Sequence, residues 1–136
     1  MIYTVTLNPA LDRYILVEEL KEDDSTRIID ETNYAAGKGI DVSRVISELG
    51  GQSVAKGLVG GYDGLNLEGL LINAGVMTDF TKISHETRTN IILKEKSTDR
   101  QYVICAKGPE RLLRVRHQVA SHLLAQLVGR CHTLQP

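Results

Sequence analysis

The segment AAGKGIDVSRVISELG, residues 35–50, places a glycine on each side of Lys38 at the point where a helix begins. Four apolar residues then follow with the spacing i, i+3, i+4 and i+7: Val42, Val45, Ile46 and Leu49. This spacing predicts a helix over residues 40–49, ended by the glycine pair at 50–51. Since glycine costs about 1 kcal/mol relative to alanine inside a helix, the two glycines beside Lys38 need a separate explanation.

Gly37 and Gly39 allow the chain to bring its backbone N–H groups close to a ligand. The first helical turn adds unpaired N–H donors and a partial positive charge, and Lys38 adds a full charge beside them. The turn is therefore suited to an oxyanion or to sugar hydroxyls, and a purely structural turn is the alternative that this pattern leaves open. The known nucleotide loops do not match, because Thr32 stands where a P-loop has its first glycine and no third glycine completes GxGxxG.

The composition is that of one modest globular domain, with 136 residues of which 42% are hydrophobic and 24% charged. The sequence contains neither a long apolar run nor an N-terminal secretory signal, so we expect a cytoplasmic protein without a membrane role. A net charge of −1 argues against nucleic acid as a partner. Cys105 and Cys131 have no metal-ligand spacing, so we expect free thiols and no metal site.

Charge divides the chain at Glu110, the last of its 17 acidic residues. Residues 1–110 carry a net charge of −5, whereas residues 111–136 carry +4 and include four arginines and three histidines. Leucines and valines in this second part fall near helical spacing, which predicts a basic helical tail. The abrupt change suggests different origins for the two parts, and an ordinary basic amphipathic helix is the alternative.

The remaining pattern alternates strands with helices. We expect strands over 2–7, 14–17, 26–29, 31–35, 53–59, 80–83, 89–93 and 101–106, and a second helix over 64–73. Residues 97–100 make a hairpin turn between the last two strands. Strand, helix, strand and helix in succession predict an α/β fold with a parallel sheet and right-handed crossovers.

Five motifs occur in order along the chain: TLNPALD at 6–12, AGKGIDVSRV at 36–45, GGYDG at 60–64, TRTN at 87–90 and GPE at 108–110. Together they resemble the N-terminal half of the PfkB carbohydrate kinases of the ribokinase-like superfamily, within it the 1-phosphofructokinase and tagatose-6-phosphate kinase branch. The resemblance covers residues 1–110. It implies a partial ribokinase-like α/β/α sandwich of parallel core strands and crossover helices. It also implies a small β-sheet lid, formed by about residues 13–35 and 88–106, that can serve as a homodimer surface.

The resemblance further implies one sugar-phosphate site with seven residues: Asp12, Gly37, Lys38, Gly39, Asp41, Arg88 and Asn90. Asp12 accepts hydrogen bonds from sugar hydroxyls, and the turn around Lys38 is the sugar-phosphate loop. Arg88 and Asn90 face the same pocket, with Arg88 suited to hold a phosphate by two parallel bonds. The alternatives from the residues alone are a turn or helix-capping aspartate and a solvated strand arginine.

Asp41 departs from the family pattern, in which asparagine is usual at this position. A carboxylate accepts hydrogen bonds but cannot donate them and repels a nearby phosphate, so we expect weaker substrate binding. The same charge is favourable in the first turn of a helix by roughly 0.3 to 1 kcal/mol. Ala36 likewise replaces a common glycine.

Members of the family are much longer than this chain, and the C-terminal half supplies their MgATP site and catalytic aspartate in a GAGD motif. That motif does not occur in this sequence. We therefore assign no catalytic and no cofactor-binding residue, and we expect the chain to be inactive alone and residues 111–136 to be non-family sequence. The reaction implied for the intact family moves the ATP γ-phosphate to a ketohexose phosphate such as fructose 1-phosphate, tagatose 6-phosphate or fructose 6-phosphate. A non-catalytic sugar-phosphate-binding module and a lid-mediated dimerisation fragment are the alternatives.

Overall fold

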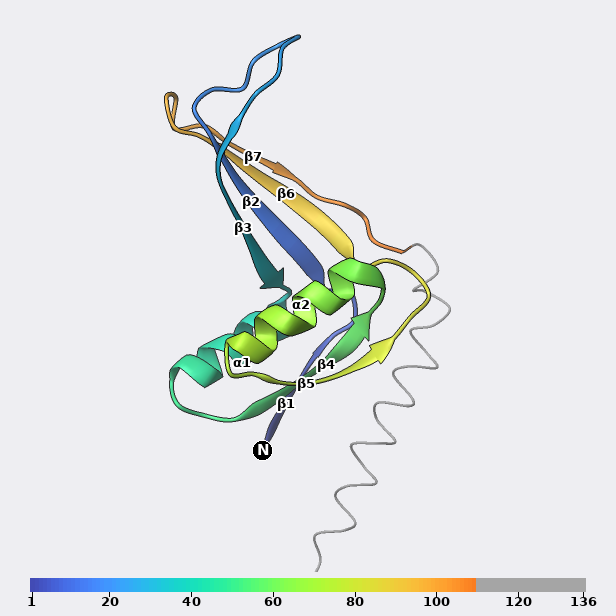
Figure 1. Ribbon diagram of the computed structural model, residues 1–136. Coiled ribbons are helices and arrows are strands. Elements are labelled where there is room, and N and C mark those ends of the chain that lie inside the picture. Colours follow the sequence, from blue (N-terminus) through green and yellow to red (C-terminus); the bar gives the residue numbers. More distant parts are fainter. Residues whose placement is uncertain (110–136) are drawn as a thin grey trace, which may run out of the picture.

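The computed structural model describes residues 1–109, which form two β-sheets and two helices (Figure 1). The strands are β1 (Ile2–Thr6), β2 (Ala10–Val17), β3 (Ile28–Ala36), β4 (Ser53–Val59), β5 (Met77–Lys82), β6 (Arg88–Glu95) and β7 (Gln101–Ile104), and the helices are α1 (Lys38–Glu48) and α2 (Gly61–Asn73). The predicted basic tail at 111–136 lies outside the described residues. Within residues 1–109, neither helix has the length and apolar character needed to cross a membrane.

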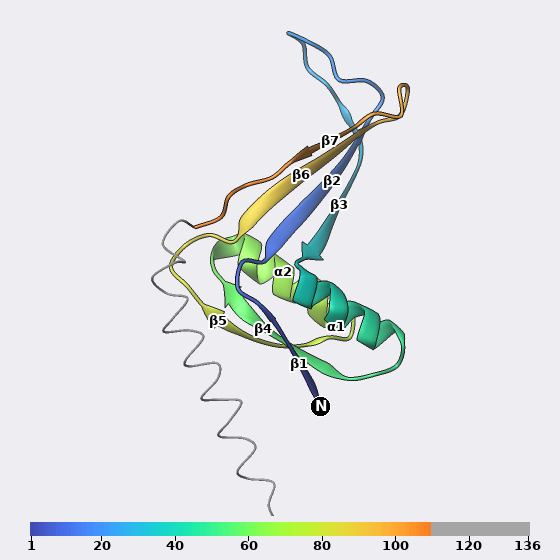
Figure 2. The same cartoon turned by 180° about the vertical axis from the view of Figure 1, so that it is seen from behind.

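A parallel sheet of order β1-β4-β5 forms the core and confirms the predicted crossovers. Both helices pack on one side of this sheet, which the two opposite views in Figures 1 and 2 show. Eight buried residues make the common cluster between sheet and helices: Ala35, Ile40, Ala55, Val59, Leu67, Leu71, Val76 and Phe80. Because Ala35 belongs to β3, the same cluster joins the core to the second sheet.

Two small residues of α1, Gly39 and Ser43, lie against β1. Ile40 and Ser43 are the buried residues of this helix, and the Ser43 hydroxyl lies 2.7 Å from that of Thr4 on β1. Three of the four apolar residues that predicted the helix are exposed, Val42 at 50%, Val45 at 52% and Leu49 at 81%, and Ile46 is half-buried. Short side chains bring the helix close to the strand, so the buried face follows Ser43 rather than the valines.

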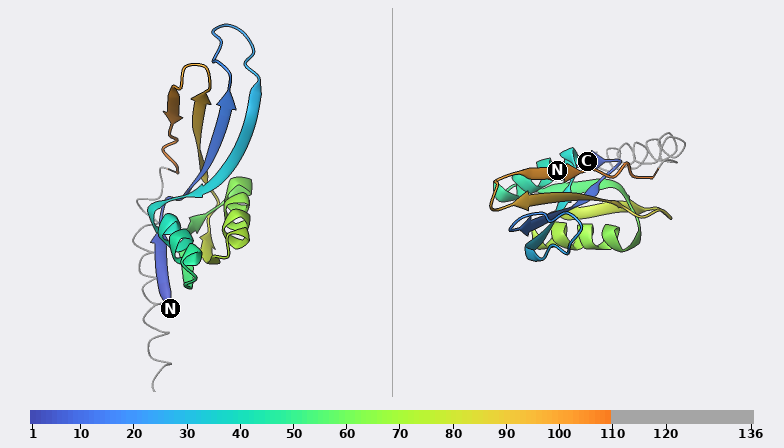
Figure 3. Two further views of the ribbon diagram at one scale, coloured as in Figure 1. Left: turned by 90° about the vertical axis from the view of Figure 1, so that its left-hand side faces the viewer. Right: turned by 90° about the horizontal axis from the view of Figure 1, so that it is seen from above.

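The second sheet, here called the lid sheet, has the order β3-β2-β6-β7 and projects away from the helices (Figure 3). β2 pairs antiparallel with β3 and parallel with β6, while β6 and β7 form a hairpin. One face at the base of this sheet packs toward α2, since Leu11 and Ala35 are register partners and both buried, and Thr89 on β6 donates to Asp63 on α2. This arrangement confirms the predicted α/β core with a small β-sheet lid.

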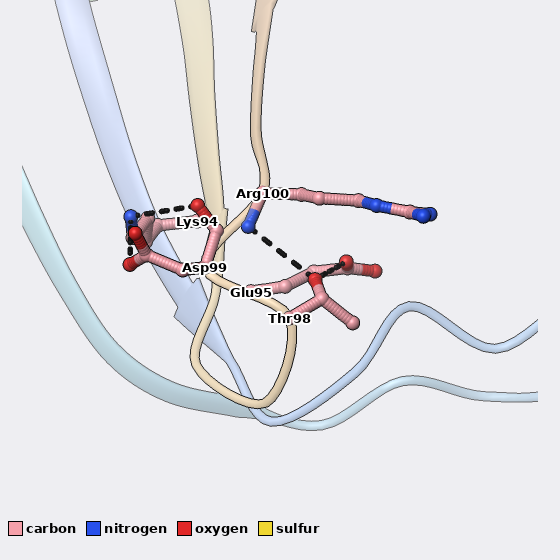
Figure 4. A network of polar contacts seen from close by, with 5 residues as sticks. All are labelled: Lys94, Glu95, Thr98, Asp99 and Arg100. Atoms are coloured by element: carbon pink, nitrogen blue, oxygen red, sulfur yellow. Dashed lines mark hydrogen bonds and ion pairs between the residues drawn. The ribbon is translucent and has the colours of Figure 1, made fainter.

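A polar network holds the tip of the lid sheet together (Figure 4). Glu95 is only 4% exposed, and its carboxylate accepts from the backbone N–H of Leu20 at 2.9 Å and from the Thr98 hydroxyl. The Thr98 hydrogen bond, followed by that of Leu20, lowers the pKa of Glu95 below its ordinary value. Lys94 pairs with Asp99 at 2.5 Å across the same turn. Glu95 thus ties the loop after β2 to the hairpin between β6 and β7.

Several predicted boundaries were wrong in the lid sheet. The strands expected at 26–29 and 31–35 are one strand, β3, because its pairing with β2 continues from Ala36 to Ile28. The strand expected at 14–17 begins at Ala10, which is paired with a neighbour on each side. Asp12 therefore lies inside a central strand and not in a turn. Tertiary pairing outweighed the local turn preference of aspartate here.

The other differences are shifts at element ends. α2 begins at Gly61 and not at residue 64, β5 occupies Met77–Lys82 instead of 80–83, and β7 ends at Ile104 instead of 106. The early start of α2 follows from the hydrogen bond that closes its first turn, from the N–H of Gly64 to the carbonyl of Gly60 at 3.2 Å. A glycine pair after a strand does not mark where the next helix begins, since here the second glycine, Gly61, already belongs to α2.

Candidate functional site

The turn before α1 lies tightly against the carboxyl end of β1. Gly37 has φ 142° and ψ 139° and is the N-cap residue. A Cβ atom at Gly37 would lie 2.6 Å from the Thr6 methyl carbon, and one at Gly39 would lie 2.7 Å from the Thr6 hydroxyl and 2.9 Å from the Val5 carbonyl oxygen. Any side chain at either position would collide with β1, so close approach is the structural reason for both glycines.

The first turn of α1 offers backbone N–H donors. Within the described residues, no side chain caps this helix, and its first backbone hydrogen bond runs from the N–H of Asp41 to the carbonyl of Gly37 at 2.8 Å. Lys38 and Asp41 are both exposed beside these donors. The turn therefore combines a positive helix end with one cation and one opposing carboxylate.

Strand register brings three of the predicted residues to the same end of the lid sheet. Asp12 on β2 is the partner of Asn90 on β6, and the amide Nδ2 of Asn90 donates to Oδ1 of Asp12 at 2.7 Å. Two residues earlier, Arg88 is the partner of Ala10, and Ala10 is the partner of Ala36. Residues two apart on a strand share a face, so Arg88, Asn90 and Asp12 project to one side of the sheet.

The same register places the glycine turn near these side chains. Ala36 is two strands from Arg88 in a single row, a separation of about 10 Å between backbones, and Gly37 follows it directly. This face is opposite to the one that packs on α2. The structure thus brings Asp12, Arg88 and Asn90 together and sets the turn around Lys38 at the edge of the same surface.

Arg88 is anchored by backbone carbonyls. Its Nη1 donates to the carbonyl of Ala106 at 3.0 Å, and its Nη2 donates to that of Asn8 at 3.4 Å. Its Nε is buried and has no hydrogen-bond partner within the described residues. Two of its five N–H bonds are therefore used inside the protein, and the predicted pair of parallel bonds to a phosphate would use the second N–H of Nη1 and of Nη2.

Residues 5–128 match the sequence profile described as pfkB family carbohydrate kinase. The chain belongs to the pfkB family. Members of this family phosphorylate sugars or sugar phosphates and use ATP and a metal ion.

Relatives within the pfkB family cover most of this chain. A 1-phosphofructokinase from Borreliella burgdorferi is 39% identical over 110 residues, which are 81% of this chain and 35% of that enzyme. A D-tagatose-1-phosphate kinase from Bacillus licheniformis is 36% identical over 109 residues, 80% of this chain and 35% of that enzyme. This chain therefore spans about a third of the length of these relatives.

Solved structures give the same fold. The crystal structure of phosphofructokinase-2 from Escherichia coli in complex with fructose-6-phosphate has a TM-score of 0.74 at 29% identity, over 88% of this chain and 41% of that chain. This and other phosphofructokinase structures confirm the predicted ribokinase-like fold.

Sequence reasoning missed two residues that hold the site. Asn8 accepts from Arg88 through its carbonyl and donates through its side chain to the carbonyl of Lys107 at 3.4 Å. The backbone carbonyl of Ala106 accepts from Arg88, and its backbone N–H donates to Asn90, both on β6. The motif TLNPALD contains Asn8, so this signal could have identified it, whereas a backbone contact such as that of Ala106 leaves no side-chain signal.

The start of α2 does not suit a phosphate of the MgATP that pfkB kinases use. At the start of α2, the carboxylate of Glu86 accepts from the N–H of Asp63 at 2.8 Å, and a Cβ on Gly61 would lie 1.7 Å from it. This carboxylate takes the helix end where a nucleotide phosphate could otherwise bind, and it would repel one. Residues 1–109 also contain no cluster of three potential metal-ligating side chains.

Proposed function

We propose that this chain is the sugar-phosphate-binding part of a pfkB carbohydrate kinase and that it holds a ketohexose phosphate between the lid sheet and the turn before α1. The observation that carries the proposal is the register of β2 and β6, which sets Asp12, Asn90 and Arg88 on one face beside the glycine turn. Their types suit the two ends of such a ligand.

Asp12 is the acceptor for sugar hydroxyls in this proposal. Its Oδ1 accepts from Asn90, and Oδ2 makes no hydrogen bond to another described residue, so one oxygen is available to a hydroxyl. Lys38, the backbone of Gly37 and Gly39, and the unused N–H bonds of Arg88 supply the positive side for a phosphate. Asp41 opposes that charge and weakens binding.

We further propose that the 136-residue chain alone does not transfer phosphate and that it resides in the cytoplasm. Two observations support the first part: the sequence contains no GAGD motif, and the carboxylate of Glu86 takes the N-terminal end of α2. Phosphoryl transfer requires groups that stabilise charge around the γ-phosphate and orient the attacking hydroxyl, and these are not among the residues assigned above.

Calorimetry on the purified chain tests the binding proposal. We expect measurable heat with fructose 1-phosphate, fructose 6-phosphate or tagatose 6-phosphate and none with fructose, because the phosphate contributes the charged contacts. Asp12→Ala removes the sugar acceptor and should weaken binding at least tenfold. The absence of heat with all three phosphates would refute the proposal. A coupled ADP-release assay tests inactivity, and sustained turnover would contradict that part alone.

A lid-mediated homodimer is a second candidate role, favoured by apolar residues on the lid sheet. Five of them are between 45% and 61% exposed: Ile28, Ile29, Tyr34, Val103 and Ile104. Burying such residues against a second copy would stabilise a dimer. Sedimentation equilibrium should then give a dimer that Val103→Glu dissociates, and a monomer at all concentrations would exclude this role.

A further inference from the structure

Both the nitrogen and the oxygen of the Asn90 side-chain amide make hydrogen bonds. Its Nδ2 donates to Oδ1 of Asp12 at 2.7 Å, and its Oδ1 accepts from the backbone N–H of Ala106 at 3.1 Å. The residue is only 8% exposed. An amide oxygen can accept and an amide nitrogen can only donate, so the N–H of Ala106 fixes which end of the amide faces Asp12.

Ala106 is itself held from the opposite side of its peptide unit. Its carbonyl accepts from Nη1 of Arg88 at 3.0 Å, while its N–H donates to Asn90. Two side chains of β6, two residues apart, thus clamp one backbone residue that follows β7. The orientation of the Asn90 amide is therefore fixed by a backbone group, the N–H of Ala106, and does not depend on a ligand.

We propose that Asn90 is a positioning residue of the sugar-phosphate site, not a contact to the ligand. It orients the Asp12 carboxylate so that Oδ1 is used and Oδ2 faces the sugar hydroxyls, and Ala106 orients Asn90 in turn. This inference rests on the proposed function, since it assigns Asn90 a role in that same site.

Two kinds of variant test this role: one removes the hydrogen bond between residues 12 and 90, and the other keeps the bond but moves the carboxylate to β6. Asn90→Asp keeps the shape and still accepts from Ala106, but it sets two carboxylates against each other at the position of the present 2.7 Å contact. Such a pair shares one proton at lower pH and repels when both groups are ionised. Among the described residues, the other charged or titratable side chains near Asp12 on this face are Arg88 on β6, Tyr14 on β2 and Tyr34 on β3, with Lys38 and Asp41 of α1 at its edge.

The matched variant exchanges the two residues, as Asp12→Asn with Asn90→Asp. The hydrogen bond then keeps its length with donor and acceptor reversed, but the carboxylate belongs to β6 and not to β2. We expect the melting temperature of Asn90→Asp to fall at pH 8 and that of the exchange variant to return near the wild-type value. Affinity for fructose 6-phosphate, measured by calorimetry, should remain at least tenfold weaker in the exchange variant.

A second measurement compares affinities at two pH values. The ratio of Asn90→Asp to wild-type affinity should be low at pH 8 and closer to one at pH 5.5, because the shared proton restores a donor toward Asp12. The ratio cancels the titration of the ligand phosphate, which is common to both proteins.

Each outcome decides between the two proposals. Wild-type affinity in the exchange variant, or an affinity ratio equal at both pH values, would overturn the positioning role and leave the proposed function intact. Failure of the exchange variant to fold would also contradict the positioning role, since its hydrogen bond is retained by design. No heat from the wild-type protein with any of the sugar phosphates would overturn the proposed function and this inference with it.

Discussion

The amide nitrogen of Asn90 donates to the carboxylate of Asp12 across 2.7 Å, although 78 positions separate the two residues in the chain. The contact exists because β2 and β6 are parallel neighbours in the lid sheet. A parallel pair needs a crossover connection, and here the connection contains both helices and two strands of the core sheet. The site on the lid sheet therefore depends on the core that links its two halves.

The fit of the glycine turn against β1 can be tested by adding a single methyl group. Gly39→Ala places Cβ 2.7 Å from the Thr6 hydroxyl and 2.9 Å from the Val5 carbonyl. Overpacking of this kind costs about 1 to 3 kcal/mol, so we expect the free energy of unfolding to fall by that amount in urea denaturation.

Gly69 in α2 is the matched control, because a Cβ there would meet no atom within 4 Å. Gly69→Ala should raise the free energy of unfolding by about 0.5 to 1 kcal/mol through helix propensity. Equal effects of the two substitutions would show that close approach to β1 does not explain Gly39.

Removing the charge of Asp41 should increase the affinity for a sugar phosphate. Its carboxylate lies in the exposed first turn of α1 and opposes an anionic ligand at that helix end. Asp41→Asn should strengthen fructose 6-phosphate binding by up to about tenfold, since about 1.4 kcal/mol corresponds to a factor of ten. Stability should fall by roughly 0.3 to 1 kcal/mol as the favourable interaction with the helix dipole is lost. Glu48→Gln at the other end of the helix should leave affinity unchanged, and an equal gain there would point to net charge alone.

The lowered pKa of Glu95 predicts a pH dependence of stability. A carboxyl group whose pKa is lower in the folded than in the unfolded protein stabilises the fold above its ordinary pKa of 4.5, and this contribution is lost as the pH falls below that value. Glu95→Gln should therefore lower the melting temperature most at pH 6 and above, with the difference narrowing toward pH 3.5. Glu22→Gln, in the exposed loop after β2, should show no such trend. A pH-independent difference between wild type and Glu95→Gln would argue that shape, not charge, matters at this position.

The hydroxyl pair of Thr4 and Ser43 couples β1 to α1 in a buried setting. The oxygens lie 2.7 Å apart, and Thr4 is 8% and Ser43 0% exposed. Thr4→Val leaves the Ser43 hydroxyl without its partner and should cost about 1 to 3 kcal/mol of unfolding free energy. The double substitution with Ser43→Ala removes both polar groups and should cost less than the sum of the two single changes. Additive effects in a double-mutant cycle would mean that the hydroxyls do not interact.

Local sequence patterns predicted the core well. The strand at 53–59 has the predicted bounds, and the helix expected at 40–49 is observed as Lys38–Glu48. In both elements the residue pattern and the flanking glycines indicate the same bounds, so the prediction depended little on tertiary contacts. The face that α1 buries could not be predicted in this way, because a serine hydroxyl bonded to Thr4 lies where the pattern favoured the valines.

The lid sheet was harder to predict because its register depends on partners far away in the chain. Asp12 reads locally as a turn residue and Asp30 separates two of the expected strands, yet both lie inside strands. Cross-strand pairing decided the outcome, and single-sequence propensities do not contain that information.

The candidate site shows the same division. Motifs identified Asp12, Arg88 and Asn90, and the structure places them on one face of the lid sheet. The clamp on Ala106 could not be predicted, since both its hydrogen bonds use backbone atoms of a residue with no functional side chain. Whether these residues hold a sugar phosphate stays a prediction until binding is measured.

The parallel pairing of β2 with β6 also sets the order of events when the protein is made. β2 and β3 leave the ribosome early as a hairpin, but the neighbour that completes them is synthesised only after both helices and β5. Contacts between segments so distant in sequence form slowly, because the intervening chain must first be ordered. The nascent hairpin therefore waits with the edge of β2 open, and shielding of that edge during translation should limit misassembly between chains on neighbouring ribosomes.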